Sequence, residues 1–368
     1  MQAFDTPSTA VPPPPRPAQQ AGRASSARDR SRTLQLVLFL AAVAWYLCAK
    51  ALSFSAANGL ALRFDLSDTQ PLLQALMLLF LVVVGLAMLR WMERRPAPLR
   101  AALGLPARAT SRDEWTTGAA MGWAIAVASI LPMGLARSLN VQLWTAPRAF
   151  YLLALSLLTL AILTLAHALA IYGFGFQRLI EATGPVRATL ILVAVVAAAH
   201  ATVAPPYGTP EGTRILVDML TTLLLCLCWQ RTHGLWLLWG LHFAWAASTG
   251  ALFGLPLAGD VTFGSVVDTR AGGPLWLTGG VYGPGAAAFS ILVLVAAIPV
   301  LVRITSDYAW EYTRPPIIAA GYDVTVAPPA AHAAMEQAAA QTAGPASLVQ
   351  IQPLTPQQQG SAAERIPE

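Results

Sequence analysis

The chain has 368 residues, of which 56% are apolar and only 11% are charged, and its formal net charge is +5 at neutral pH. Soluble domains carry about 25% charged residues, so 23 basic and 18 acidic side chains are too few to cover a soluble chain of this length. The composition predicts an all-α, multi-pass membrane protein in a lipid bilayer. It excludes a cytosolic enzyme, a nucleic-acid binder and a disulfide-stapled secreted module.

The chain begins with residues 1–32, a polar stretch with a Pro12–Pro15 run that is predicted to be a disordered tail. A helix that crosses the bilayer needs about 20 mostly apolar residues. Eight segments fit that description, and the sixth is short and contains Asp218. The eight are 34–54, 72–89, 116–135, 149–174, 188–204, 215–229, 234–253 and 285–302. A second disordered tail, rich in Ala, Gln and Pro, is predicted for residues 325–368.

The placement of basic residues predicts the topology. With eight spans both termini lie on one side, and that side holds sixteen basic residues up to Arg314 against six on the other. The positive-inside rule therefore places both termini in the cytoplasm. Arg outnumbers Lys by 22 to one, which suggests a GC-rich bacterial genome and thus a bacterial cytoplasmic membrane. The Arg-rich segment 90–112 is interpreted as a topology determinant, with lipid or protein binding as the alternative.

Two other features of the chain carry expectations. The three cysteines, Cys48, Cys226 and Cys228, lie in apolar segments, where buried thiols are expected rather than disulfides or metal ligands. The connection 254–284 is long and rich in Gly and Pro, yet it also contains large apolar residues. We expect it to fold back over the outer mouth of the bundle, either as a structural cap or as a gate for a substrate.

Ionisable residues within the predicted spans are the first place to look for function, because they are costly in a membrane. His167 lies 17 residues before Gly184 and His200 lies 16 residues after it, so each is about 25 Å from that turn. His242 can reach the same layer if the turn after the short sixth span is sunk into the membrane. We expect the three histidines to share a site, which Asp218 either joins or leaves for a solvated or capping position. Three His ligands with a water are a known catalytic zinc arrangement, so zinc is one hypothesis for this site.

One run of the chain, Gly234-Leu-Trp-Leu-Leu-Trp-Gly-Leu-His-Phe-Ala-Trp, is the strongest of several motifs that resemble those of a known family. It is similar to the third signature of the CPBP family of intramembrane proteases, named for CAAX proteases and bacteriocin-processing enzymes. The others are Phe253-Gly-Leu-Pro, the run Gly273-Pro-Leu-Trp-Leu-Thr-Gly-Gly-Val-Tyr-Gly-Pro, Phe176-Gln-Arg-Leu, Gly184-Pro185, and His200 as the histidine of the second signature. The resemblance divides the chain into the tail 1–32, transmembrane helices and a basic loop at 33–99, a CPBP-like core at 100–303 and a mostly disordered cytoplasmic tail at 304–368.

The chain departs from the first family signature, which is a Glu pair followed after three residues by Arg. His167, Ala168 and Tyr172 stand at those three positions. The resemblance implies a reaction in which the first Glu and a His activate water against a peptide carbonyl. Neither carboxylate is present here, although a neutral imidazole at His167 can in principle accept a proton.

The chain keeps the histidines of the other two signatures but not their partners. Val196 replaces the Phe that precedes His200, and Ala246 replaces the Asn that follows His242. In the family, the second His and the Asn would stabilise the oxyanion, which an alanine cannot do. These departures favour a CPBP-like scaffold, or a regulatory or immunity-type factor with a membrane protein or peptide partner. The alternatives are an active intramembrane endopeptidase with an altered site of His167, His200 and His242, and a transporter or lipid-handling protein.

Overall fold

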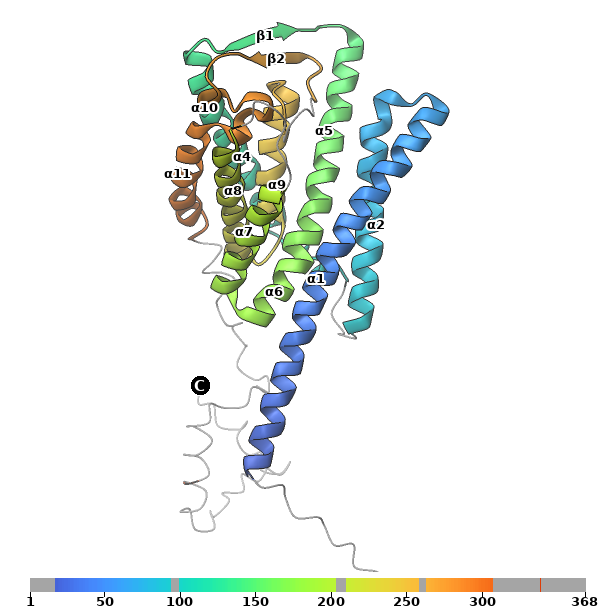
Figure 1. The fold of residues 1–368 in the computed structure, drawn as a ribbon, viewed down its shortest axis with the longest axis vertical. Helices are drawn as coiled ribbons and strands as arrows, with labels where there is room; N and C mark the ends of the chain where they lie inside the picture. The colour runs from blue at the N-terminus through green and yellow to red at the C-terminus, as the bar shows by residue number, and fades with distance from the viewer. Residues whose placement is uncertain (1–16, 94–98, 203–209, 258–262, 307–337, 339–368) are drawn as a thin grey trace, which may run out of the picture. The chain divides into compact units, whose positions relative to one another are not determined.

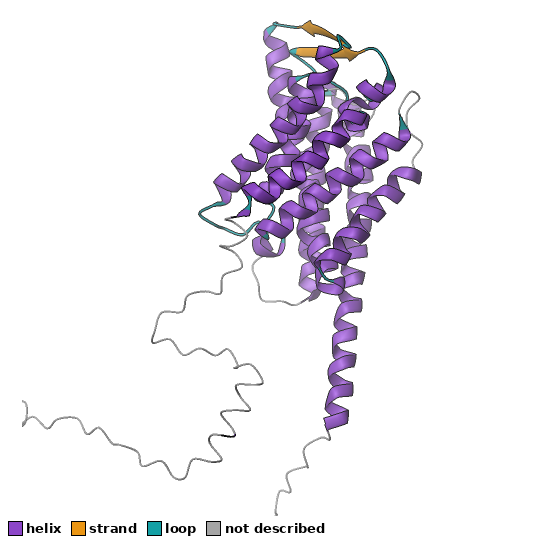
Figure 2. Ribbon diagram, turned by 90° about the vertical axis from the view of Figure 1, so that its left-hand side faces the viewer, coloured by secondary structure: helices purple, strands orange, loops and turns teal. Residues whose placement is uncertain are grey.

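The computed structural model describes residues 17–93, 99–202, 210–257, 263–306 and 338. Nearly all of these belong to one compact unit, Met1–Arg314, and only Ala338 is described in the second unit, Pro315–Glu368. The predicted C-terminal tail 325–368 therefore lies outside the described residues, apart from Ala338. The described part of the first unit consists of long helices joined by shorter connections and one two-stranded sheet (Figures 1 and 2).

The elements follow the chain in an order that alternates long helices with short turns. They are α1 (Pro17–Phe64), η1 (Ser67–Thr69), α2 (Gln70–Glu93), α3 (Leu99–Ala102), α4 (Ser111–Leu135), β1 (Leu139–Leu143), α5 (Pro147–His167), η2 (Ala168–Gly175), α6 (Phe176–Thr183), α7 (Pro185–Thr202), α8 (Glu211–Thr232), α9 (Trp236–Ala246), η3 (Ala247–Leu252), β2 (Val267–Ala271), α10 (Leu275–Thr278), η4 (Gly280–Ala286) and α11 (Ala288–Ile304).

Seven helices in the described residues are long and apolar enough to cross a membrane, which confirms a polytopic helix bundle. They correspond to seven of the eight predicted spans. The remaining one, predicted at 234–253, forms α9 and η3, which have 11 and 6 residues. Together they are one residue shorter than the shortest of the seven, Pro185–Thr202, which has 18. The count of eight and the cytoplasmic placement of both termini stay predictions.

Two predicted boundaries were wrong at the ends of helices. Residues 17–32, predicted to be disordered, form the start of α1, because Ala, Gln and Arg are good helix formers and the helix continues into the first span. The sixth span was predicted at 215–229, but α8 runs over 22 residues from Glu211 to Thr232. Its polar end residues fall outside an apolar window and are nevertheless helical. The prediction of a short sixth span was therefore wrong, and so was the prediction of a turn sunk into the membrane that followed from it.

The cysteine prediction is also corrected in part. Cys226 and Cys228 are buried, as expected, but Cys48 is exposed on α1. An apolar segment that crosses a membrane presents part of its surface to lipid, so an apolar neighbourhood in sequence does not imply burial within the protein.

Helices α4 and α9 pack with their backbones in close contact, and glycines make that approach possible. A Cβ on Gly118 would lie 2.1 Å from the carbonyl oxygen of Leu237, and one on Gly122 would lie 2.2 Å from that of Leu241. From the other helix, a Cβ on Gly240 would lie 2.2 Å from the carbonyl oxygen of Trp115. Small residues at such crossings are typical of membrane helix pairs. This contact fixes the helix that carries His242.

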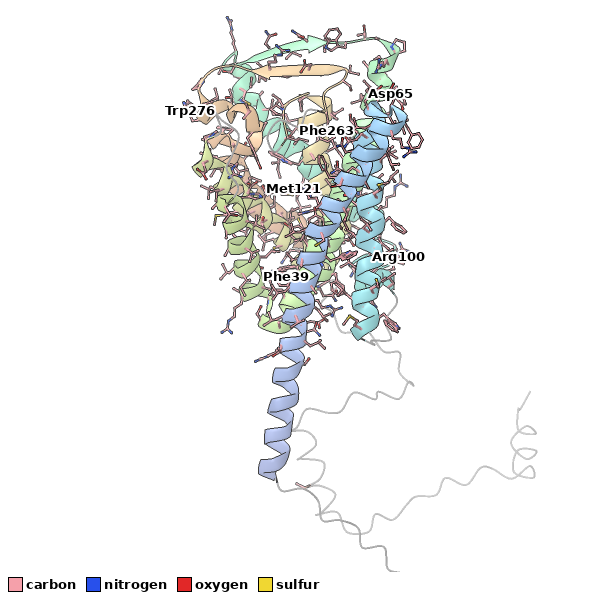
Figure 3. All side chains as sticks on the ribbon, turned by 45° about the vertical axis from the view of Figure 1, so that its right-hand side comes forward. Phe39, Asp65, Arg100, Met121, Phe263 and Trp276 are labelled. Atoms are coloured by element: carbon pink, nitrogen blue, oxygen red, sulfur yellow. The ribbon has the colours of Figure 1, made fainter. Side chains whose placement is uncertain are left out.

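The segment 254–284 folds back onto one end of the helices, as expected, although residues 258–262 are not described. Its strand β2 pairs antiparallel with β1, with Leu139 opposite Ala271, and the two strands lie beyond the helix ends (Figure 1). Phe263 packs against a small buried cluster that includes Leu160 and Ala247. Phe263 and Trp276 lie toward the end of the helices that carries the strands (Figure 3). The sequence did not predict either strand.

Candidate functional site

Four aromatic and histidine side chains meet inside the helix bundle, and we call them the aromatic–histidine cluster: Tyr46, His167, Tyr172 and His242. The hydroxyl of Tyr46 on α1 is hydrogen-bonded to Nδ1 of His167 at 3.1 Å. The His167 ring contacts the His242 ring edge to face at a centroid distance of 5.5 Å and the Tyr172 ring at 5.7 Å. The predicted proximity of His167 and His242 is therefore found in the structure.

A change of helix type places two of these residues. His167 ends α5 and is followed directly by the π-helical segment η2, which contains Ala168 and Tyr172. A second π-helical segment, η3, follows Ala246 at the end of α9. π-Helical turns are rare and are frequent at functional sites. The two candidate helices thus deviate from α-geometry directly after His167 and Ala246, which belong to the motifs that resemble the family signatures.

Side chains at the replaced signature positions are buried and mostly without polar groups. Ala168 is fully buried and Ala246 is 7% exposed. Tyr172 is also buried, with its ring centroid 5.7 Å from that of His167. Two methyl groups and a phenol therefore occupy the positions that the sequence resemblance pairs with a carboxylate, an amide and a guanidinium of the CPBP signatures. None of the four members of the aromatic–histidine cluster is acidic.

His200 is paired with Asp218. Nδ1 of His200 on α7 is hydrogen-bonded to Oδ2 of Asp218 on α8. Both side chains are partly exposed, His200 at 35% and Asp218 at 20%. Arg214, one turn before Asp218, donates to the backbone oxygen of His200 at 2.8 Å, and its guanidinium lies over the ring of Tyr282. The uncertain role of Asp218 is thus resolved as that of a partner to His200.

The three histidines do not form the zinc site considered from the sequence. Across the described ranges, no group of three or more His, Cys, Asp or Glu side chains has the geometry to hold a metal ion. Nδ1 of His167 is bonded to Tyr46, and Nδ1 of His200 is bonded to Asp218. Helix rise predicts depth but not the rotation of a side chain about its helix, which is why equal depth did not give a common ligand set.

The helices define a multi-pass α-helical membrane protein whose mainly apolar core encloses the aromatic–histidine cluster. No known protein family, curated protein or solved structure matches the chain. The resemblance to the CPBP family consequently rests on the sequence motifs alone.

The bond between Tyr46 and His167 supplies a first prediction. Removing the hydroxyl with Tyr46→Phe leaves a partly buried imidazole nitrogen without its partner, and we expect the free energy of unfolding to fall by about 1–2 kcal/mol. Thermal unfolding of the purified protein in detergent measures this change. Tyr151→Phe is the control, because Tyr151 is exposed on α5. Equal unfolding temperatures for the two variants would contradict the prediction.

Proposed function

We propose that this chain is a CPBP-like membrane protein of the bacterial cytoplasmic membrane that has lost peptidase activity. It acts as a membrane scaffold, or as a regulatory or immunity-type factor, that holds a membrane protein or peptide partner. The observation that carries the proposal is the content of the aromatic–histidine cluster. His167 is held by Tyr46, Tyr172 and His242, and the flanking signature positions hold Ala168 and Ala246.

Peptide hydrolysis requires a general base and hydrogen-bond donors for the oxyanion, and the replacements in this chain remove groups of both kinds. A positioned general base contributes roughly 10²–10⁴ in rate, and one oxyanion donor contributes roughly 10²–10³. Ala168 offers no carboxylate and Ala246 offers no donor, while His167, at the position of the first Glu, has its Nδ1 hydrogen-bonded to Tyr46. The phenol of Tyr172 cannot replace a guanidinium as a fixed positive charge. A CPBP-like site with these replacements lacks the carboxylate pair, the oxyanion donor and the fixed positive charge that the family reaction needs.

One observation favours a second candidate, an active intramembrane endopeptidase with an altered His-based site. The His200–Asp218 pair has the arrangement in which a carboxylate orients an imidazole as a general base. Because both side chains are partly exposed, a water molecule can approach His200. In this alternative Asp218, which is absent from the family signatures, substitutes for the missing carboxylates.

A host strain lacking the protein separates the two candidates. It is complemented with wild type, His200→Ala, Asp218→Asn or His242→Ala, and protein N-termini in its membranes are compared by mass spectrometry. The scaffold proposal predicts that all three variants restore the wild-type phenotype and that no cleavage product depends on the protein. Amounts of each variant in the membrane and their unfolding temperatures control for folding.

The opposite result has a defined pattern. The endopeptidase alternative replaces the scaffold if cleavage of a membrane protein depends on the wild-type protein and both His200→Ala and Asp218→Asn reduce that cleavage by about 100-fold or more. A reduction of that size is what the loss of a general base produces. A complex with a defined partner that is recovered in equal amounts from wild-type and His200→Ala cells supports the scaffold proposal.

A further inference from the structure

A cavity of about 630 Å³, wide open to the surface, lies at the end of the bundle opposite the strands, beside the first turns of α4 and α9. Three arginines and three tryptophans supply most of its lining: Arg100, Arg108, Arg112, Trp115, Trp236 and Trp239. The volume is within the range of pockets that bind small ligands, about 300–1,000 Å³. This cavity is separate from the aromatic–histidine cluster and from the His200–Asp218 pair.

The arginines of the cavity have different tasks. Arg108 donates to the backbone oxygens of Thr232 and His233 at the end of α8 and so holds the wall in place. Arg100 and Arg112 are exposed, and neither forms an ion pair with a residue that the structure describes. The first turn of α4, whose Ser111 also lines the cavity, carries Asp113 and Glu114, and Glu114 is buried 3.7 Å from Arg108. Arg100 and Arg112 supply the positive charge of the lining that has no ion-pair partner among the described residues. The cavity therefore favours an anion.

The tryptophans give the cavity an amphipathic wall. The indole N–H of Trp236 donates to the backbone oxygen of Pro106, and that of Trp239 donates to Ala161, each at 3.1 Å. The indole nitrogen of Trp115 is buried and makes no hydrogen bond with any part of the chain that the structure describes. Trp239 lies against both Trp115 and Trp236, at ring-centroid distances of 5.9 and 6.1 Å, so the three rings form one continuous wall.

The position of the cavity relative to the membrane indicates what kind of anion it takes. Ser111–Leu135 is one of the membrane-spanning helices, and Arg112 lies in its first turn. Arg100 and Arg112 are thus placed at the depth of lipid head groups, and Trp is enriched at the same depth. Arg pairs with phosphate oxygens through two parallel hydrogen bonds. Basic pockets between membrane helices are known to hold anionic lipid head groups.

We propose that this cavity binds the phosphate head group of an anionic phospholipid from the leaflet at the Arg-rich end of the bundle. Arg100 and Arg112 contact the phosphate, and the tryptophans contact the glycerol region and the upper acyl chains. A free phosphate ion would use the arginines but not the tryptophan wall. The inference does not depend on the proposed function, since it involves neither His167 nor His200.

Native mass spectrometry of the full-length protein tests the inference. The protein is released from mixed micelles that contain equal amounts of phosphatidylglycerol and phosphatidylcholine with the same acyl chains. We expect selective retention of phosphatidylglycerol, and we expect the double variant Arg100→Gln/Arg112→Gln to retain it about tenfold less. The control is Arg187→Gln/Arg303→Gln, which removes the same charge from exposed residues at the same end of the bundle but outside the cavity.

Each outcome supports or overturns the inference. Loss of the lipid in the cavity variant but not in the control supports it, provided that both variants unfold at the wild-type temperature in detergent alone. Equal retention by the two double variants overturns it, because the attraction is then a general effect of positive charge. Displacement of the lipid by millimolar inorganic phosphate, with equal binding of phosphate alone, overturns the assignment to a phospholipid.

Discussion

Gly122→Ala is expected to lower the free energy of unfolding by about 1–3 kcal/mol, although it adds one methyl group and improves helix propensity. The added Cβ would lie 2.2 Å from the carbonyl oxygen of Leu241, and no side-chain rotation can relieve the clash, because the backbone fixes the positions of both atoms. Helices α4 and α9 must separate, and the contacts along their whole crossing weaken. His242 follows Leu241 directly on α9, so the same movement displaces it from His167.

A glycine on the same helix provides the matched control for this prediction. A Cβ on Gly134 would meet no atom within 4 Å, so Gly134→Ala adds the same methyl group at an open site. We expect that variant to be neutral or to gain up to about 1 kcal/mol, because alanine loses less backbone entropy than glycine in a helix. Unfolding of both variants by denaturing detergent, followed by circular dichroism, gives the comparison. Similar stabilities would mean that α4 and α9 are not held by close backbone packing.

The membrane helices were predictable because the bilayer imposes a length of apolar sequence that few other structures need. Helix ends were less predictable. Glu211 and Arg231 are polar and fall outside an apolar window, yet both are part of α8. Polar residues at the ends of a spanning helix lie in the interfacial region, where hydropathy no longer reports secondary structure. The strands β1 and β2 were missed for a related reason, since they pair over a separation of more than 100 residues and have exposed side chains in β1.

Most residues of the interior site could be predicted from the sequence, but which of them contact one another could not. The sequence indicated His167, His200, His242 and Asp218, all of which lie in polar contacts in the structure or beside one another. It did not indicate Tyr46, because the family resemblance leaves the first helix outside the core. A tyrosine within an apolar span is itself a signal, since its hydroxyl needs a partner. Which partner it finds depends on helix rotation and on the π-helical turn at η2, neither of which follows from hydropathy.

The segment rich in arginine shows how one pattern can serve two purposes. Arginines at 90–112 were interpreted as a topology determinant, and that interpretation needs only their charge. In the structure Arg108 donates to two backbone oxygens at the end of α8, and its guanidinium lies 3.7 Å from Glu114. Glu114 is fully buried. Arg108 is therefore a structural residue, in contrast to the exposed Arg112 in the same segment.

Arg108→Met is accordingly expected to lower the free energy of unfolding by about 3 kcal/mol, the usual cost of removing one partner from a buried charge pair. Methionine keeps much of the side-chain volume but removes the donors to Thr232 and His233 and the positive charge beside Glu114. The control Arg112→Gln should change stability by less than about 0.5 kcal/mol, because Arg112 is exposed. Adding Glu114→Gln to Arg108→Met should restore part of the loss, since an amide costs less to bury than an unpaired carboxylate.

The pH dependence of stability gives this prediction a second readout. The pKa of His233, which lies just beyond the end of α8, is lowered by its partial burial and by the positive charge of Arg108. A histidine with a lowered pKa in the folded state binds fewer protons than in the unfolded state, so it contributes less stability as the pH falls below about 6.5. Arg108→Met removes one cause of the shift, and the pKa of His233 should rise toward its ordinary value. His233→Gln removes the contribution of His233 to the pH dependence of the free energy of unfolding. That contribution should therefore be smaller when His233→Gln is made in Arg108→Met than when it is made in the wild type. An unchanged contribution would show that Arg108 does not act on His233 electrostatically.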